Sequence, residues 1–105
     1  MILHIDVVNK VATYQKRDGC IVCGNSGYQI EFNFDSEWDN VSDKWAKFIC
    51  DGQPTQEALI DAEDGICNVP VIRNANKVLI GVYSESAGMA TTGTEIPCKK
   101  SILCT

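Results

Sequence analysis

The sequence contains a single histidine, His4, and it contains neither a G-x-S-x-G elbow nor a phosphate-binding loop. Catalysis by a Ser-His-Asp or Cys-His arrangement would have to use that one histidine. Because His4 alternates with Leu3 and Ile5, we expect it on the opposite face of a strand, exposed to solvent. The sequence therefore argues against nucleophilic catalysis, and we predict that the protein is not an enzyme.

Positive charge is also scarce. The sequence has 9 lysines and arginines and 14 aspartates and glutamates. The basic residues are scattered apart from Lys16-Arg17 and Lys99-Lys100. Binding to a phosphate backbone needs a concentrated basic face. No apolar run approaches the roughly 20 residues that span a bilayer, and the opening segment, MILHIDVVNK, lacks the basic start of a signal peptide. We therefore predict no nucleic-acid partner, no membrane partner and no secretion by a signal peptide.

Helical periodicity is missing as well, whereas alternation of apolar and polar residues is common. In residues 28–34 the aromatic and aliphatic side chains share one parity, which is typical of a half-buried strand. The other expected strands are residues 2–8, 11–15, 20–23, 45–50, 57–61, 66–72, 77–84 and 95–104. Arg17-Asp18-Gly19 predicts a hairpin turn, and the apolar run at 77–84 predicts a central strand buried on both faces. Together these predict one all-β domain, residues 1–105, forming an antiparallel sandwich of about eight to ten short strands.

Cysteine is abundant for a chain of this length. The six cysteines are Cys20, Cys23, Cys50, Cys67, Cys98 and Cys104. Since the sequence shows no leader into an oxidising compartment, we expect reduced thiols and not disulfides. Most of them share the parity of apolar neighbours, as Cys50 does with Ala46 and Phe48, so we expect them to fill the core.

The pair Cys20 and Cys23 supports an alternative function, that of a small zinc or redox protein. Two thiolates at this spacing, followed by a glycine, can chelate zinc from one knuckle. A structural zinc site needs a second pair, and the nearest candidates, Cys98 and Cys104, have an unfavourable spacing. Positions i and i+3 of a strand also face opposite sides, which counts against both roles. We therefore predict no metal and no cofactor.

Acidic residues form two groups along the chain. They are Asp35, Glu37, Asp39 and Asp43, followed by Asp61, Glu63 and Asp64. Calcium binds several converging oxygens, but the first group lacks the glycine and the downstream glutamate of the helical calcium-binding loop. We interpret both groups as solvated acidic turns.

Aromatic residues support a second alternative, a carbohydrate-binding module. The candidates for a stacking platform are Trp38, Trp45, Tyr14 and Tyr83, with the two tryptophans as its centre. Flat aromatic faces bind the apolar faces of sugar rings because the π-system attracts their C–H groups. The opposing interpretation is that Trp38 plugs one end of the sandwich and that Trp45 begins a core strand. Sequence alone leaves both interpretations open.

Several motifs, in a fixed order, resemble a small domain of bacteriophage tail and baseplate proteins. They are the aromatic strand at 28–34, the acid-Glu-Trp turn at 35–39, the Lys-Trp-Ala-Lys-Phe segment at 44–48, the Asp-Gly turn leading to Val-Pro at 64–70, and the Gly-Val-Tyr strand at 77–84. This order is similar to that of the N-terminal domain of the baseplate upper protein family, found in phages of Gram-positive hosts. The six cysteines depart from the family pattern.

The resemblance implies an immunoglobulin-like antiparallel β-sandwich and a structural role in the virion. Such a protein acts through protein–protein contacts in virion assembly or host adhesion. Its partners would be other virion proteins, copies of itself in a homo-oligomer, or a host-surface carbohydrate. It would be made in the bacterial cytoplasm and then reside in the virion tail. Edge strands and loops supply contacts in such assemblies, so we predict an interaction surface that includes Trp38, Asp39, Pro54 and Met89.

Overall fold

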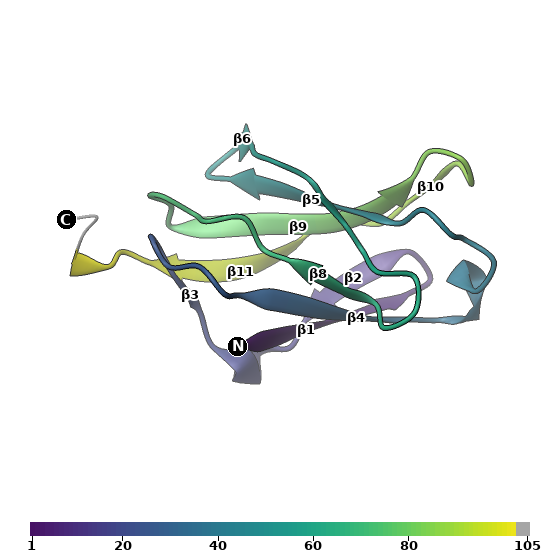
Figure 1. Ribbon diagram of the computed structural model, residues 1–105, viewed down its shortest axis with the longest axis horizontal. Helices are drawn as coiled ribbons and strands as arrows, with labels where there is room; N and C mark the ends of the chain where they lie inside the picture. The colour runs from purple at the N-terminus through teal and green to yellow at the C-terminus, as the bar shows by residue number, and fades with distance from the viewer. Residues whose placement is uncertain (103–105) are drawn as a thin grey trace.

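Two β-sheets form the two layers of the computed structural model, which describes residues 1–102 (Figure 1). The four-stranded sheet has the order β2 (Val11–Tyr14), β1 (Ile2–Val8), β4 (Gln29–Phe34) and β8 (Ile66–Asn68). The seven-stranded sheet has the order β3 (Ile21–Val22), β11 (Thr94–Lys99), β9 (Lys77–Ser84), β5 (Trp45–Cys50) and β6 (Gln53–Pro54), with β10 (Met89–Ala90) on β9 and β7 (Ala58–Leu59) on β5. The helical segments in this range, η1 (Lys16–Asp18) and η2 (Ser36–Trp38), are single 3-10 turns, too short to cross a membrane.

The predicted all-β class is confirmed, and alternation accounts for the core. In β1 the side chains of Leu3, Ile5 and Val7 are fully buried, while the intervening residues are partly exposed. The same rule holds in β5, where Ala46 and Phe48 point into the core. Because successive side chains of a strand point to opposite faces, each sheet contributes one apolar face, and the two faces meet in a single cluster.

The prediction of wholly antiparallel sheets is wrong for two strand pairs. β4 lies parallel to β1, with Ile2 opposite Gln29 and Val7 opposite Phe34. β3 lies parallel to β11 in the other sheet. Parallel neighbours need a long connection, and residues 15–28 supply one. After β2 the chain leaves the four-stranded sheet, adds β3 to the other sheet and returns in the direction of β1.

The predicted hairpin at Arg17-Asp18-Gly19 is also wrong, because β2 and β3 belong to different sheets. The Asp18 carboxylate instead accepts a hydrogen bond from the main-chain N–H of His4, at 2.8 Å, which holds η1 against β1. The tight hairpin of this region is the β1–β2 turn. Asn9 and Lys10 both have positive φ, 52° and 62°, the backbone required by a two-residue turn that matches the strand twist.

The outer edge of β2 is closed by threonine hydroxyls. The main-chain N–H groups of Ala12 and Tyr14 donate to the Oγ1 atoms of Thr92 and Thr94, at 3.2 and 3.0 Å. The Lys10 carbonyl in turn accepts from the Thr92 N–H, at 2.9 Å. Unpaired N–H groups on an edge strand would otherwise be a template for another chain. These bonds join the edge of one sheet to the other.

Strand β9 is central in its sheet, as predicted, but it is not buried on both faces. Val78, Ile80 and Val82 lie in the core, with at most 2% of their surface exposed. Leu79 and Tyr83 point to the opposite face and are half-buried. This outer face of the seven-stranded sheet therefore presents partly exposed apolar and aromatic side chains.

Candidate functional site

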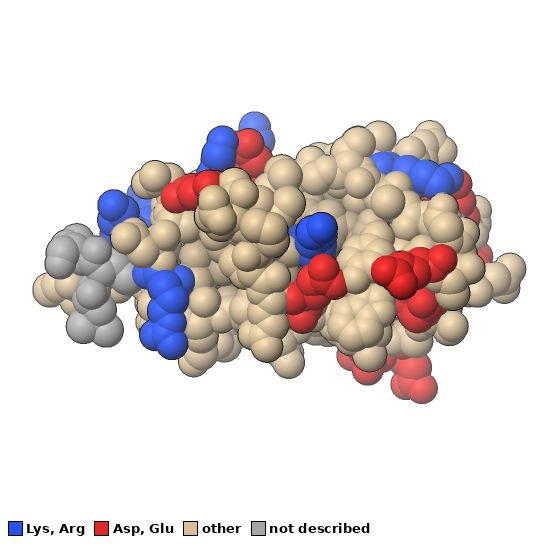
Figure 2. All heavy atoms as spheres, turned by 90° about the horizontal axis from the view of Figure 1, so that it is seen from above, with Lys and Arg blue, Asp and Glu red and all other residues tan. Residues whose placement is uncertain are grey.

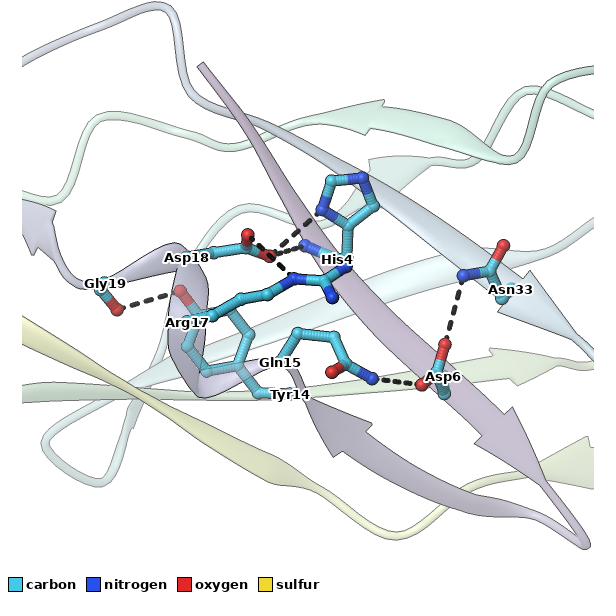
Figure 3. A network of polar contacts seen from close by, with 8 residues as sticks. All are labelled: His4, Asp6, Tyr14, Gln15, Arg17, Asp18, Gly19 and Asn33. Atoms are coloured by element: carbon cyan, nitrogen blue, oxygen red, sulfur yellow. Dashed lines mark hydrogen bonds and ion pairs between the residues drawn. The ribbon is translucent and has the colours of Figure 1, made fainter.

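The outer face of the four-stranded sheet carries a polar network (Figure 3). The Asn33 amide of β4 donates to the Asp6 carboxylate of β1 at 3.0 Å, and the Gln15 amide donates to the same carboxylate from the end of β2. His4 and Asp6 share this face because they are two residues apart on one strand. Asp6 is therefore hydrogen-bonded to side chains on both sides of β1, which suits a solvated surface.

His4 is the centre of a second part of this network. Its side chain is 30% exposed, in partial agreement with the predicted exposure, and its Nδ1 lies 3.0 Å from Asp18 Oδ2. Burial opposes ionisation of Asp18, but hydrogen bonds from the His4 side chain and main chain outweigh it and lower the pKa of Asp18. The Tyr14 hydroxyl donates to the Gly19 carbonyl at 2.8 Å, and burial, followed by the charge of Asp18, raises the pKa of Tyr14 to about 12. These bonds fix η1 on the sheet.

Acid is expected to weaken the fold through Asp18. The pKa of this group is lower in the folded chain than its ordinary value of 3.8. Its ionised form therefore stabilises the fold above that value, and the contribution is lost as the pH falls through the folded-state pKa. We expect the melting temperature of the Asp18→Asn variant to fall less between pH 5 and pH 3 than that of the unaltered protein. An equal fall in the melting temperatures of the two proteins over this range would contradict the role of Asp18.

A hollow of about 420 Å³ lies on the outer face of the seven-stranded sheet, and we call it the outer groove. The residues that form it and matter for its chemistry are Lys47, Ile49, Glu57, Leu79, Gly81, Tyr83, Glu85 and Thr91. Figure 2 shows this face from above: uncharged residues make up most of it, and basic and acidic side chains meet beside a recess near its middle. The volume falls within the range of small-molecule sites.

A β-bulge forms one wall of the outer groove. Ala90 is opposite Tyr83 and Thr94 is opposite Ile80. Between these two pairs β9 has three residue steps, whereas the segment from β10 to β11 has four. The extra residue lies within residues 91–93, where Thr91 Oγ1 accepts the main-chain N–H of Val82 at 3.0 Å. Bulges of this kind bend a strand and redirect side chains, and they often adjoin functional sites.

Polar groups converge above the floor of the outer groove. Lys47 is opposite Gly81 in the β5–β9 register, so no side chain of β9 lies directly opposite that of Lys47. The Tyr83 hydroxyl donates to the Glu57 carboxylate, and this bond is the main cause that raises the pKa of Tyr83 to about 12. Trp45, which is half-buried, lies directly opposite Tyr83. One aromatic ring, that of Tyr83, an ammonium group and a carboxylate therefore line one hollow, and Trp45 lies beside it.

The predicted interaction residues do not form one surface. Trp38 is only 1% exposed, and its ring lies 5.4 Å from that of Phe34, so it belongs to the core and is wrong as a surface residue. Asp39 and Pro54 are exposed and Met89 is half-buried. β6, which contains Pro54, lies at the opposite end of its sheet from β10, which contains Met89 (Figure 1).

The stacking platform of four aromatic residues is likewise incomplete. Trp38 and Tyr14 are buried, at 1% and 5% exposure, because each fills the core beneath its own sheet. Trp45 and Tyr83 remain half-exposed on the outer face of the seven-stranded sheet. Stacking of a sugar on Trp38 is therefore wrong, whereas Tyr83 lines the outer groove and Trp45 lies beside Tyr83.

One end of the molecule gathers three segments that are distant in sequence, and we call it the loop end: residues 8–11, 35–43 and 86–88. The Asp35 carboxylate accepts from the Asn9 N–H at 2.9 Å, and Lys10 forms an ion pair with Glu37. These two contacts tie the β1–β2 turn to the segment around η2. The three segments lie together at the end opposite β3 and β6 in Figure 1.

The third segment of the loop end is held by Asp43. Its carboxylate accepts from the hydroxyls of Ser86 and Ser84, the latter at 3.0 Å, and the Ser86 bond is the main cause that lowers the pKa of Asp43. Beside these contacts, Val8 and Val11 are opposite one another in the β1–β2 register and are 55% and 49% exposed. The loop end therefore combines ordered loops with an exposed apolar pair.

The cysteines are mostly core residues, as predicted. Cys23, Cys67 and Cys98 are buried, while Cys20 and Cys50 are half-buried, and all five are free thiols. Burial raises the pKa of Cys67 and of Cys98 to about 12, which disfavours the reactive thiolate. Cys104 lies outside the described residues.

Neither Cys20 with Cys23 nor the acidic turns belong to a metal-binding cluster among residues 1–102. Within residues 1–102, no group of three or more histidine, cysteine, aspartate or glutamate side chains has the geometry of a metal site. Asp61 accepts the N–H groups of Glu63 and Asp64, at 2.8 and 3.3 Å, so its carboxylate orders its own turn. Cys23 Sγ lies 3.4 Å from the Ala75 carbonyl, inside the core.

Sequence reasoning missed the outer groove and the valine pair of the loop end. A glycine inside a strand often marks a bulge or a close approach of backbone, and Gly81 is the local signal that pointed to the groove. Val8 and Val11 carry no such signal, because their exposure depends on the turn between them. No protein-family model, no curated protein and no solved structure matches this chain.

Proposed function

We propose that this chain is an immunoglobulin-like β-sandwich domain of a bacteriophage tail or baseplate. It acts through protein–protein contacts in virion assembly or host adhesion, with copies of itself or with other virion proteins. In support, the motifs at residues 28–48 form β4, η2 and β5, the corner at which the chain passes from one sheet to the other. The resemblance therefore involves residues on which the fold depends.

The arrangement of the loop end is the observation that carries this proposal. Its three segments are joined by hydrogen bonds and an ion pair before any partner binds. Ordered loops lose less conformational entropy on association than free ones. Val8 and Val11 add an apolar centre, and Asp39 adds charge at its border. A surface with an apolar centre and a polar rim is the usual form of a protein contact.

Native mass spectrometry of the purified chain tests the proposal. We expect assemblies at multiples of the 11.5 kDa chain mass. Replacing both Val8 and Val11 with lysine should shift the protein to monomer, because two buried charges without partners oppose association. Leu59→Lys is the matched control, since Leu59 is 56% exposed, close to the 55% of Val8, and lies on β7, outside the loop end. A monomer at all concentrations, or assemblies that the double variant leaves intact, would contradict the self-association that we propose.

A further inference from the structure

We propose that the outer groove binds a neutral sugar ring. This goes beyond the proposed virion role and does not depend on it, because the groove shares no residue with the loop end. Three features carry the inference: the Tyr83 ring that lines the groove with Trp45 as its cross-strand neighbour, the hollow above Gly81, and the mixture of charges around that hollow.

The shape of the groove suits a flat ring with one apolar face. Tyr83 and Trp45 are neighbours across β9 and β5, and both are half-exposed on the same face of the sheet. The C–H face of a pyranose packs against such rings through dispersion and through attraction to the π-system. Gly81 leaves the adjacent position free of side-chain atoms, and the bulge at residues 91–93 closes one side.

The charges of the groove select against simple ions. An anion would meet the carboxylates of Glu57 and Glu85, and a cation would meet the ammonium group of Lys47. A neutral polyol satisfies both kinds of group, since its hydroxyls can accept from Lys47 and donate to Glu57. Within the described part of the chain, the Lys47 side chain has no hydrogen-bond or ion-pair partner. It is therefore free to bind a ligand oxygen.

Glu57 is already positioned for this role. One of its carboxylate oxygens accepts the Tyr83 hydroxyl, which fixes the acid beside the ring that would stack on the sugar. The other oxygen remains an acceptor for a ligand hydroxyl. In the β5–β7 register Ala46 is opposite Ala58, so the next pair places Glu57 opposite Lys47. A donor and an acceptor thus stand side by side, the pairing that adjacent ring hydroxyls require.

An array of immobilised glycans tests the inference with the intact chain. The array carries neutral hexose and N-acetylhexosamine oligosaccharides, together with sialylated and amino-sugar glycans as charged comparisons. We expect retention on neutral glycans, and saturable quenching of tryptophan fluorescence when the best-retained oligosaccharide is titrated in solution. Retention on none of the neutral glycans, or on charged glycans alone, would overturn the proposal.

Two variants locate the binding site. Gly81→Ala places a methyl group on the groove floor, where its nearest neighbours are 3.4 Å away, so the fold should be kept. Its affinity should fall about tenfold, because a single added methyl group commonly costs that much in a fitted site. Tyr83→Ala should abolish quenching. Unchanged affinity in both variants, with unchanged melting temperature, would place the ligand elsewhere and overturn the proposal.

The lysine double variant at Val8 and Val11 separates this inference from the proposed assembly role. It should lose the assemblies and still bind the oligosaccharide with unaltered affinity. Glycan binding by a chain that never assembles would contradict the self-association proposal and leave the sugar site standing. Assembly without glycan binding would contradict the sugar site and leave the self-association proposal standing.

Discussion

Replacing Trp38 with alanine is expected to lower the free energy of unfolding by about 3–5 kcal/mol, the range for removing a large buried aromatic ring. Trp38 is the largest fully buried side chain among the described residues, at 1% exposure, and it packs against the Phe34 ring. The loss is comparable with the whole stability of a small domain, about 5–15 kcal/mol. Urea denaturation followed by circular dichroism measures it directly.

Two controls accompany the Trp38 variant. Trp45→Ala removes a half-buried ring from the outer face and should cost only about 1–2 kcal/mol, in proportion to the smaller area buried. Trp38→Phe keeps a ring against Phe34 and removes the indole N–H, which is buried without a partner among the described residues. Its cost should fall below that of Trp38→Ala. Equal costs for Trp38→Ala and Trp45→Ala would show that Trp38 is not a core residue.

Gly65→Ala is expected to be the second severe change, with a loss of about 3 kcal/mol or more from strain and displaced backbone together. Gly65 has φ of 71°, and an added Cβ would lie 2.9 Å from the Phe32 carbonyl oxygen. The same glycine accepts the Phe32 N–H at 2.9 Å and donates to Asp61. The backbone cannot move away without breaking these bonds, so the β4–β8 edge should loosen.

Gly88→Ala is the matched control for Gly65→Ala. Gly88 also has positive φ, 65°, but no atom lies within 4 Å of its added Cβ. This variant should therefore show only the conformational cost, about 1–3 kcal/mol. The difference between the two variants, measured by thermal or urea unfolding, isolates the clash with Phe32. Equal losses would show that the β4–β8 edge adjusts freely.

Local patterns in the sequence were sufficient for the longest strands. The bounds of β1 and β5 are those expected from alternation, because a period of two is set by neighbouring residues, and the bounds of β9 are those of its apolar run. Pairing is different, since it depends on where distant segments return. Nothing near Gln29 indicates that β4 runs parallel to β1, and nothing near Asp18 shows that its carboxylate bonds to His4 instead of closing a hairpin.

The candidate sites were less predictable than the strands. Sequence left two interpretations of Trp38 open, and the choice depends on the position of η2 against β4. The outer groove exists because of the β5–β9 register and one extra residue in the chain after β10, neither of which leaves a strong local pattern. The sequence shows that Trp45 and Tyr83 are aromatic strand residues, but their proximity follows only from the pairing of β5 with β9.

The threonine bonds at the edge of β2 have a consequence for how the chain is synthesised. Ala12 and Tyr14 bond to residues 80 positions further along, and β3 pairs with β11. A ribosome makes the N-terminal strands first, at about 5–20 residues per second. Until β11 emerges, the edge of β2 and the whole of β3 have no lasting partner. Closure of the two sheets must therefore follow translation of nearly all these residues, and until then the edge of β2 remains open to pairing with other chains.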